Sequence, residues 1–541
     1  MCPYDRVEPV VGERLARRRN LNIKARDTRM KMLLAVSSGI LSFLAFPPFE
    51  FAFLAWVALV PMLCVFRYEV SIKEAFFYPF LAGVIFFSGL LSWLAGVTIP
   101  GMIILIIVLS SLYGIFGLGV KYVLKASVNF LAIPLMWVIL EYTRGFIFTG
   151  FPWGLLAYSQ YTNLNLIQIA DLTGAYGVSF IIAAVNTAFA AWGFRLKRKV
   201  AYLMTALLLI VVAVTYGIFK FKNYYVRGSF KASVVQGNIP QDHKWDAAFA
   251  DEIIEKYVNL TEKTVEQDSP DMVIWPETAY PYLVENMTEA PPEIAAFIEK
   301  WKTPLLAGVV VKRGDEYFNS AMLFDQDAKV SGFYSKTHLV PFGEYIPFKK
   351  AFSFLREHID KPIGNFERGG DYDIFRIKSV VLSSSEKAKT RRTDFYKFGV
   401  LICFEDVFPY ITRKFVKKGA NFMVTITNDA WFGKTAAARE HLQASVFRAV
   451  ENRVPMIRAA NTGISCFIDS TGKILKVAKK NGKEIFVSAF LADYINMYVG
   501  RVYYTTYGDV FMLFCGVVLI LLVGIEKILK KVKFAKNGSI R

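Results

Sequence analysis

The chain has 541 residues, more than the roughly 100–200 residues of one ordinary domain, so at least two folding units are expected. It is 54% hydrophobic, with 47 Phe, 27 Tyr and 9 Trp, and this composition excludes a disordered or fibrous protein. The 64 Lys and Arg against 45 Asp and Glu give a net charge of +19, which in a soluble protein would indicate nucleic-acid binding. A mean hydropathy of +0.36 favours a membrane protein instead. The five cysteines do not form a disulfide framework.

Long runs without charged residues predict a polytopic α-helical membrane protein. A membrane helix needs about 20 mostly apolar residues. Runs of this kind predict about eight spans: 31–48, 51–67, 75–97, 101–121, 126–143, 173–194, 200–220 and 509–529. The spans at 51–67 and 126–143 are the weakest, and a buried core helix is the alternative for any single short run.

The basic residues indicate the orientation of these spans. Residues 1–31, residues 195–199 and the tail after Ile525 carry net charges of +5, +4 and +5, and Lys121 and Lys125 lie in a further loop. With eight spans, all four stretches fall on the cytosolic side, so both termini are expected there. The excess charge is therefore a topology feature, and no nucleic-acid partner is expected.

The same pattern divides the chain into segments. A basic cytosolic arm (1–30) precedes a membrane domain of seven spans (31–220), and an eighth span (509–529) precedes a basic cytosolic tail (530–541). Residues 221–508 have the composition of a soluble domain, which this topology places outside the cytosol. Short apolar runs predict strands at 232–235, 272–275, 305–311, 320–324, 398–403, 422–427 and 463–468. Helical patterns lie between them at 247–267, 291–302, 409–419 and 437–452, which predicts an inserted α/β domain.

Two charged residues in this domain follow apolar strands. Glu277 comes directly after a proline that ends its strand, a position that suits a general base, although a glutamate in a turn is the commoner interpretation of that motif alone. Lys336 precedes a loop rich in Pro and Gly, where a fixed ammonium can stabilise an oxyanion, although most isolated lysines are solvated. Glu344 in that loop either pairs with Lys336 or is a simple loop carboxylate.

Cys403 ends an apolar strand and begins a turn toward a helix. Such a turn exposes a nucleophile and directs backbone N–H groups at it, so the Phe404 N–H is the expected oxyanion donor. Glu277 and Lys336 are candidates for the base and the positive field that form the thiolate. A lone cysteine is more often a small buried hydrophobe.

A Cys–His catalyst is the obvious rival. The chain has four histidines, and His338 and His441 lie in motif-rich segments, so counting residues does not decide between the two catalysts. The sequence contains no HExxH, no CxxC and no clustered His/Asp set, so no metal site is expected. It contains no GxGxxG and no P-loop either, so no nucleotide is expected.

Three motifs in chain order resemble the Glu-Lys-Cys signature of the nitrilase (carbon–nitrogen hydrolase) superfamily. They are Trp275-Pro-Glu277-Thr278, Tyr334-Ser-Lys336-Thr-His-Leu-Val-Pro-Phe-Gly-Glu344 and Ile402-Cys403-Phe-Glu405. With the predicted spans, residues 32–525 resemble the apolipoprotein N-acyltransferase family of bacteria. Further matches are Gly150-Phe-Pro-Trp153, Gln168–Phe180, Gln236–Trp245, Asn428–Gly433, Arg458–Gly463 and Tyr507-Gly-Asp509. The resemblance implies a nitrilase-like αββα sandwich for the inserted domain; the N-terminal arm and residues 384–394 fall outside it.

The resemblance also implies an activity. The family transfers a fatty acyl chain from a phospholipid to the α-amino group of the diacylglyceryl-modified N-terminal cysteine of an apolipoprotein. By resemblance, Glu277 takes the Cys403 proton, the thiolate attacks the ester, and Lys336 and the Phe404 N–H hold the oxyanion. An acyl thioester on Cys403 then passes to the amine, with ping-pong kinetics. The implied partners are a phospholipid donor and a diacylglyceryl-apolipoprotein acceptor, in the bacterial cytoplasmic (inner) membrane with the catalytic domain on the periplasmic face; we expect a monomer without metal or cofactor.

Insoluble substrates require an apolar entrance at the outer leaflet. The aromatic candidates for this entrance or its lid are Trp153, Trp245, Phe342, Tyr345, Trp431 and Phe432; interfacial anchoring or core packing is an equally common role for each. By resemblance, Trp245, Glu344 and Glu405 surround the active site. Glu405 either orients Lys336 or Cys403, or caps the following helix.

Two other classes of protein compete with this interpretation. A membrane-tethered amidase or nitrilase would use the same triad with water as the acceptor. A transporter or receptor would only bind its ligand, and the triad would then be unexplained. The predicted spans and the Gly150–Trp153 loop favour a lipid substrate.

Overall fold

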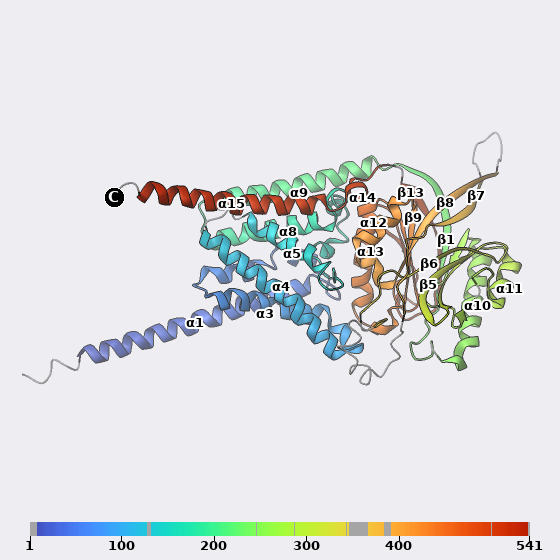
Figure 1. Cartoon of the computed structure of the whole chain (residues 1–541), viewed down its shortest axis with the longest axis horizontal. Coiled ribbons are helices and arrows are strands. Elements are labelled where there is room, and N and C mark those ends of the chain that lie inside the picture. The colour runs from blue at the N-terminus through green and yellow to red at the C-terminus, as the bar shows by residue number, and fades with distance from the viewer. Residues whose placement is uncertain are drawn as a thin grey trace, which may run out of the picture.

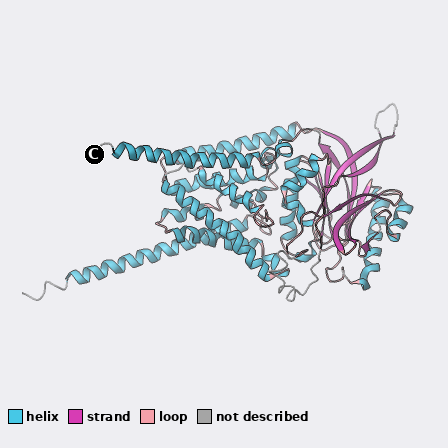
Figure 2. Ribbon diagram, viewed as in Figure 1, coloured by secondary structure: helices cyan, strands magenta, loops and turns pink. Residues whose placement is uncertain are grey.

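The computed structural model describes residues 8–126, 131–244, 246–285, 287–341, 343–345, 366–382, 391–498 and 500–538. Helices fill one end of the molecule and all described strands gather at the other, together with helices that flank them (Figure 2). We refer to residues 8–222 and 510–538 as the membrane unit and to residues 226–498 as the sheet unit. The first residues of α1 (Glu8–Leu44) and the last residues of α15 (Val510–Gly538) lie at the end away from the sheets (Figure 1).

Five described helices of the membrane unit are long and apolar enough to cross a membrane. Their apolar stretches are Ile72–Leu90 in α3, Ile99–Leu124 in α4 (Ile99–Ala126), Ala175–Gly193 in α8, Lys199–Lys222 in α9, and Val510–Ile528 in α15 (Val510–Gly538). Each coincides with one of the predicted spans. The prediction of a membrane protein is therefore supported by these five helices.

The other three predicted spans have a different form. Residues 31–44 of the run at 31–48 belong to α1 (Glu8–Leu44), a helix that continues from the basic arm, and residues 45–48 lie in the turn that follows. The run at 51–67 divides into η1 (Ala52–Trp56), α2 (Val60–Cys64) and η2 (Val65–Arg67). The run at 126–143 contains α5 (Ala132–Arg144), whose 13 residues reach about 20 Å, less than the ~30 Å hydrocarbon core of a bilayer. The count of eight spans is not confirmed.

The short segments of the membrane unit are apolar because other helices cover them. Leu59, Met62 and Leu63 are buried, and the Leu59 N–H donates to Asn186 Oδ1 of α8 at 2.8 Å. Hydropathy alone cannot separate such a covered segment from a lipid-facing span. The loop after α5 is built in the same way, from η4 (Leu156–Gln160), α6 (Leu164–Ile167) and α7 (Ala170–Thr173).

The sheet unit contains two sheets. The seven-stranded sheet has the order β13-β1-β2-β4-β5-β6, with β3 paired to β4, and the six-stranded sheet has the order β12-β11-β10-β9-β8-β7. The strands of the first are β1 (Val226–Gln236), β2 (Met272–Ile274), β3 (Leu283–Val284), β4 (Leu305–Arg313), β5 (Glu316–Phe324), β6 (Val330–Ser335) and β13 (Ala489–Tyr498). Those of the second are β7 (Phe375–Leu382), β8 (Arg391–Ile402), β9 (Phe422–Thr427), β10 (Met456–Ala460), β11 (Cys466–Ile468) and β12 (Ile474–Val477).

The two sheets pack face to face between two layers of helices (Figure 1). Across the interface, the rings of Phe230 in β1 and Phe422 in β9 stack with centroids 5.3 Å apart. Helices α10 (Ala250–Asp268) and α11 (Pro292–Trp301) cover the first sheet, and α12 (Pro409–Lys417) and α13 (Ala437–Asn452) cover the second. The central strands β2, β4 and β9 are buried along nearly their whole length, as expected for parallel strands covered on both faces.

Helix α13 is buried on every side because it lies between the second sheet and the membrane unit. Its polar side chains bond to both. Glu451 accepts from the Ala175 N–H of α8 at 3.0 Å, and directly after the helix Arg453 pairs with Asp171 of α7 at 3.0 Å. Burial is tolerated here because each of these charges has a partner. The contacts fix the sheet unit against the membrane unit, with α14 (Tyr503–Tyr507) leading back into α15.

Candidate active site

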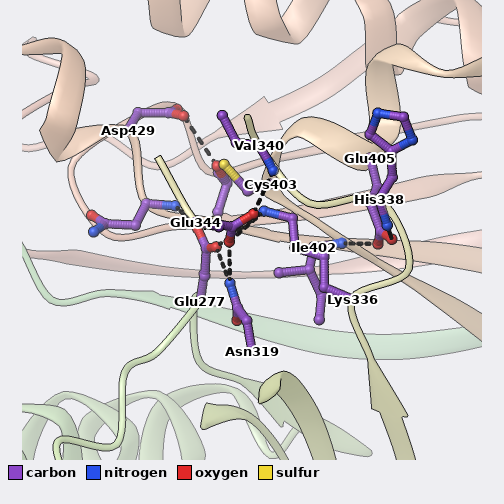
Figure 3. A network of polar contacts seen from close by, with 12 residues as sticks. Glu277, Asn319, Lys336, His338, Val340, Glu344, Ile402, Cys403, Glu405 and Asp429 are labelled. Atoms are coloured by element: carbon purple, nitrogen blue, oxygen red, sulfur yellow. Dashed lines mark hydrogen bonds and ion pairs between the residues drawn. The ribbon is translucent and has the colours of Figure 1, made fainter. Parts of the chain in front are cut away.

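Each predicted site residue follows the carboxyl end of a strand, two of them in the first sheet and one in the second. Glu277 follows β2, Lys336 follows β6 and Cys403 follows β8, and the structure brings all three together (Figure 3). Gly308 of β4 allows the close approach of the Glu277 segment, because a Cβ there would lie 2.3 Å from the Pro276 carbonyl oxygen and 2.7 Å from Glu277 Cα. Glu277 and Lys336 come from the first sheet and Cys403 from the second, so residues distant in sequence meet here because the two sheets pack face to face.

Lys336 is the buried cation of the site, with a side chain only 1% exposed. Its Nζ lies 2.9 Å from Glu344 Oε1 and 3.8 Å from Glu277 Oε1. Burial by itself lowers the pKa of the lysine, but the carboxylates of Glu344 and Glu277 outweigh this effect, so the net pKa is raised. Lys336 therefore stays charged. Of the two alternatives for Glu344, the structure shows the ion pair with Lys336.

Asn319 of β5, which the sequence analysis did not single out, connects the two carboxylates. Its Nδ2 donates to Glu277 Oε1 at 2.7 Å and to Glu344 Oε1 at 2.9 Å. The second oxygen of Glu277 accepts from the Asn428 N–H at 2.8 Å, and the second oxygen of Glu344 accepts from the Val340 N–H at 2.8 Å. Each carboxylate thus accepts a hydrogen bond at both of its oxygens, which fixes its orientation.

Cys403 lies at a strained turn, with φ at +53° and the residue only 8% exposed. A left-handed conformation at a residue other than glycine costs about 1–3 kcal/mol and persists only when its surroundings fix it. Burial raises the pKa of the thiol well above its ordinary value, Glu277 raises it further, and Lys336 lowers it. The resting thiol is therefore protonated and needs a nearby base. Phe404 lies in the first turn of η7 (Cys403–Val407), where amides have no partner within the helix.

Glu405 connects the segments that carry Lys336 and Cys403. Its Oε1 accepts from the N–H groups of Thr337 and His338 at 2.7 and 3.1 Å, and its Oε2 accepts from the Ile402 N–H at 2.9 Å. The hydroxyls of Tyr334 and Thr337 also donate to it. Both predicted alternatives are partly present: the carboxylate caps the start of η7, and it also fixes the neighbours of Lys336 and Cys403.

A second buried lysine lies close to these groups. Lys244 is 4% exposed, and its Nζ donates to the main-chain oxygen of Glu277 at 2.8 Å. Burial lowers its pKa to about 8, and the nearby Glu277 carboxylate opposes this shift. It belongs to the Gln236–Trp245 motif, which the sequence marked without assigning a role to this residue.

The two histidines of the Cys–His alternative contact other groups. His338 Nδ1 lies 3.0 Å from the Tyr410 hydroxyl, and His441 Nε2 lies 3.2 Å from the main-chain oxygen of Cys403. Neither of these two contacts is with the Cys403 thiol. Within the described ranges, no group of three or more His, Cys, Asp or Glu side chains is arranged to hold a metal ion.

Aromatic side chains from both units gather beside Cys403. Trp153, from the membrane-unit loop, stacks near Phe404 with centroids 6.3 Å apart. Trp93 of η3 (Ser92–Gly96) was not a candidate from the sequence. Its ring centroid lies 5.3 Å from that of Trp153 and 4.5 Å from that of Phe432. The remaining candidates are Tyr345 and Trp431, both half-buried, and Trp245 and Phe342, which lie outside the described residues.

Two family profiles match the chain, one in each unit. The profile of the apolipoprotein N-acyltransferase N-terminal domain matches residues 38–188, and the carbon–nitrogen hydrolase profile matches residues 231–496. Solved structures similar to the sheet unit include Saccharomyces cerevisiae Nit3 of the nitrilase superfamily (17% identity, TM-score 0.35, 50% of this chain and 91% of that one). A carbon–nitrogen hydrolase from Helicobacter pylori G27 gives similar values (19% identity, TM-score 0.34, 50% and 89%). The matched profiles and the strand-end site define a carbon–nitrogen hydrolase unit joined to membrane helices.

Proteins that are similar to this chain over about nine-tenths of its length identify the family within this class. The apolipoprotein N-acyltransferase of Geobacter metallireducens is 36% identical over 512 residues, covering 90% of this chain and 93% of that protein. Those of Methylococcus capsulatus and Pasteurella multocida are 30% and 28% identical and cover 88% and 92% of this chain, and 92% and 96% of their own lengths. The chain belongs to the apolipoprotein N-acyltransferase family.

Proposed function

We propose that the protein transfers a fatty acyl chain from a phospholipid to the N-terminal amine of a diacylglyceryl-cysteine apolipoprotein, through a thioester on Cys403. The observation that carries this proposal is the convergence of Glu277, Lys336 and Cys403 beside aromatic side chains of the membrane unit. Family membership supplies the substrate classes. The geometry supports the roles that the proposal assigns to the residues.

In the first step, Glu277 takes the proton of Cys403 as the thiolate forms a bond to the ester carbonyl carbon. The negative charge that develops on the carbonyl oxygen is stabilised by Lys336 and the Phe404 N–H. The ester C–O bond then breaks, and Glu277 returns its proton to the leaving lysophospholipid oxygen. Because burial raises the pKa of the free thiol, the attack needs a base, and Glu277 takes that role.

In the second step, the neutral N-terminal amine attacks the thioester carbonyl. Glu277 accepts a proton from the amine and passes it to the Cys403 sulfur as the C–S bond breaks. Lysophospholipid leaves before the acceptor reacts, so ping-pong kinetics follow. A thioester is reactive enough to acylate an amine without a nucleotide, and the scheme needs no metal or organic cofactor.

We place the enzyme in the bacterial cytoplasmic membrane, with the sheet unit on the periplasmic side and both termini in the cytosol. The basic stretches at 195–199 and after Ile525 support this orientation. The start of α1 and the end of α15 lie away from the sheets, as the orientation requires (Figure 1). Trp153, Trp431 and Tyr345 are the described candidates for contact with the acyl substrates, and a monomer contains every residue that the scheme uses.

The alternative function is a membrane-tethered amidase that uses water as the acceptor. Purified protein, a phospholipid and a diacylglyceryl-cysteine peptide distinguish the two functions by mass spectrometry of the peptide. N-acylated peptide is the expected product. Release of free fatty acid without acylation of the peptide would contradict the transferase proposal.

A further inference from the structure

Four buried charged side chains lie behind the nucleophile, and the scheme above uses none of them. They are Asp406 of η7, Asp429 of η8 (Asp429–Phe432), His441 of α13 and Arg458 of β10. His441 Nε2 lies 2.7 Å from Asp406 Oδ1, its Nδ1 lies 3.2 Å from Asp429 Oδ1, and Arg458 pairs with Asp406. Every side chain of the set is 2% exposed or less.

The set contacts the nucleophile through one hydrogen bond. His441 Nε2 lies 3.2 Å from the main-chain oxygen of Cys403. That oxygen and the Asp406 carboxylate only accept hydrogen bonds, so Nε2 carries the hydrogen and donates it. The other nitrogen lies 3.2 Å from both Asp429 Oδ1 and Arg458 Nη2. It donates to Asp429 when the ring is charged and accepts from Arg458 when the ring is neutral, so the bond to Cys403 exists in both states.

This hydrogen bond restrains Cys403, whose main chain has the strained conformation described above. Cys403 has φ at +53°, which L-residues rarely adopt without external restraint. The amide of Ile402, on one side, is fixed by Glu405, and the carbonyl of Cys403, on the other, is fixed by His441. Together they set the direction of the thiol relative to the Phe404 N–H.

His441 is held in turn by the membrane unit. The ring of Trp153 stacks on the imidazole with centroids 5.6 Å apart and planes inclined by 30°. The Trp153 indole N–H donates to Oε2 of the adjacent Glu440 at 2.7 Å, and the Trp93 indole N–H donates to the same oxygen at 3.2 Å. The imidazole therefore lies between the nucleophile and a membrane-unit tryptophan that borders the site.

We propose that His441 is a positioning residue, which holds the main chain of Cys403 in the conformation that aligns the thiol with the oxyanion donor and is itself held by Trp153 of the membrane unit. For the acylation step this inference rests on the proposed function. It assigns His441 no contact with substrate and no part in proton transfer. Docking of the two units thereby becomes a condition for an aligned nucleophile.

The test compares His441→Gln, His441→Asn and His441→Phe in the full-length protein in detergent. A glutamine amide can reach the Cys403 carbonyl, whereas asparagine is one methylene too short and phenylalanine keeps only the ring stack. Phe447→Leu is the control, because Phe447 is buried in the same helix and packs on Tyr158 with centroids 5.2 Å apart, away from Cys403. Two rates are measured: acylation of Cys403 by phospholipid in single turnover, and alkylation of Cys403 by iodoacetamide, with mass spectrometry identifying the modified peptide.

A displacement of the nucleophile by about 1 Å costs on the order of 100-fold in rate, so the Asn and Phe variants should acylate about that much more slowly at saturating phospholipid. The half-saturating phospholipid concentration should not change, and the Gln variant should recover most of the rate. Equal rates for the Gln and Asn variants, or an Asn variant as fast as Phe447→Leu, would overturn the proposal. The Gln and Asn pair decides the matter even if the Phe variant is recovered in poor yield. If Cys403 of the wild-type protein is alkylated by iodoacetamide but never acylated by phospholipid, the proposed function has failed. The order of the alkylation rates among the variants then still tests the positioning role.

Discussion

Asn319→Ala should uncouple the two carboxylates of the site without removing any of the proposed catalytic groups. Asn319 is 3% exposed and donates one hydrogen bond to each of Glu277 and Glu344. A hydrogen bond to a charged group contributes about 1.5–3 kcal/mol. If the transition state loses the stabilisation that this hydrogen bond to Glu277 provides, acylation slows by about 10- to 150-fold. In the variant the two Oε1 atoms would share Lys336 alone, so Glu277 would no longer be held in one orientation.

The assay is single-turnover acylation of Cys403 by phospholipid, followed by intact-protein mass spectrometry. Asn452→Ala is the matched control, because Asn452 is also buried and donates to the Arg448 carbonyl at 3.2 Å, but lies at the end of α13 away from the site. The control should keep the wild-type rate, and Asn319→Asp, which adds a third carboxylate, should be slower than Asn319→Ala. A wild-type rate for Asn319→Ala would refute the bridging role.

Three further variants test other parts of the account. Lys336→Met leaves Glu277 and Glu344 buried without their cation, a loss of about 3–5 kcal/mol in stability, and no acyl adduct should form. Because Lys336 lowers the pKa of Cys403, the same variant should shift the rise of alkylation rate with pH to higher pH, and an unshifted profile would argue against that charge effect. Glu405→Gln offers an amide group in place of one acceptor oxygen, so acylation should slow although Glu405 touches neither Glu277 nor the thiol; an unchanged rate would show that Glu405 serves only as a cap. Arg453→Met removes the partner of Asp171 between the units, so the thermal midpoint in detergent should fall, whereas alkylation of Cys403 below that midpoint should not change; an unaltered midpoint would mean that this ion pair does not hold the units together.

Much of the site was accessible from the sequence because its groups stand at strand ends. Glu277, Lys336 and Cys403 each stand at or just after the end of a strand, where the pattern of apolar runs makes them visible. The face-to-face packing of the two sheets then brings them together. Asn319 could not be found in this way, since it lies inside β5 in an ordinary strand pattern. His441 was marked only as a rival base, because a motif cannot show which atom of a neighbour an imidazole contacts.

The membrane unit was predicted less accurately than the sheet unit for a related reason. An apolar run reports that a segment avoids water, and both lipid and other helices satisfy that condition. The 51–67 run contains buried residues that pack against α8, and α5 ends after 13 residues although its sequence is apolar. Hydropathy does not record whether lipid or another helix covers a segment.

The covalent intermediate is the central claim of the account. Intact-protein mass spectrometry of the wild-type protein with phospholipid alone should show one added acyl chain, located on Cys403 after digestion. Addition of a diacylglyceryl-cysteine peptide should discharge the adduct and yield the N-acyl peptide. N-acyl peptide formed by a Cys403→Ala variant, or fatty acid released by the wild-type protein without any adduct on Cys403, would contradict the account.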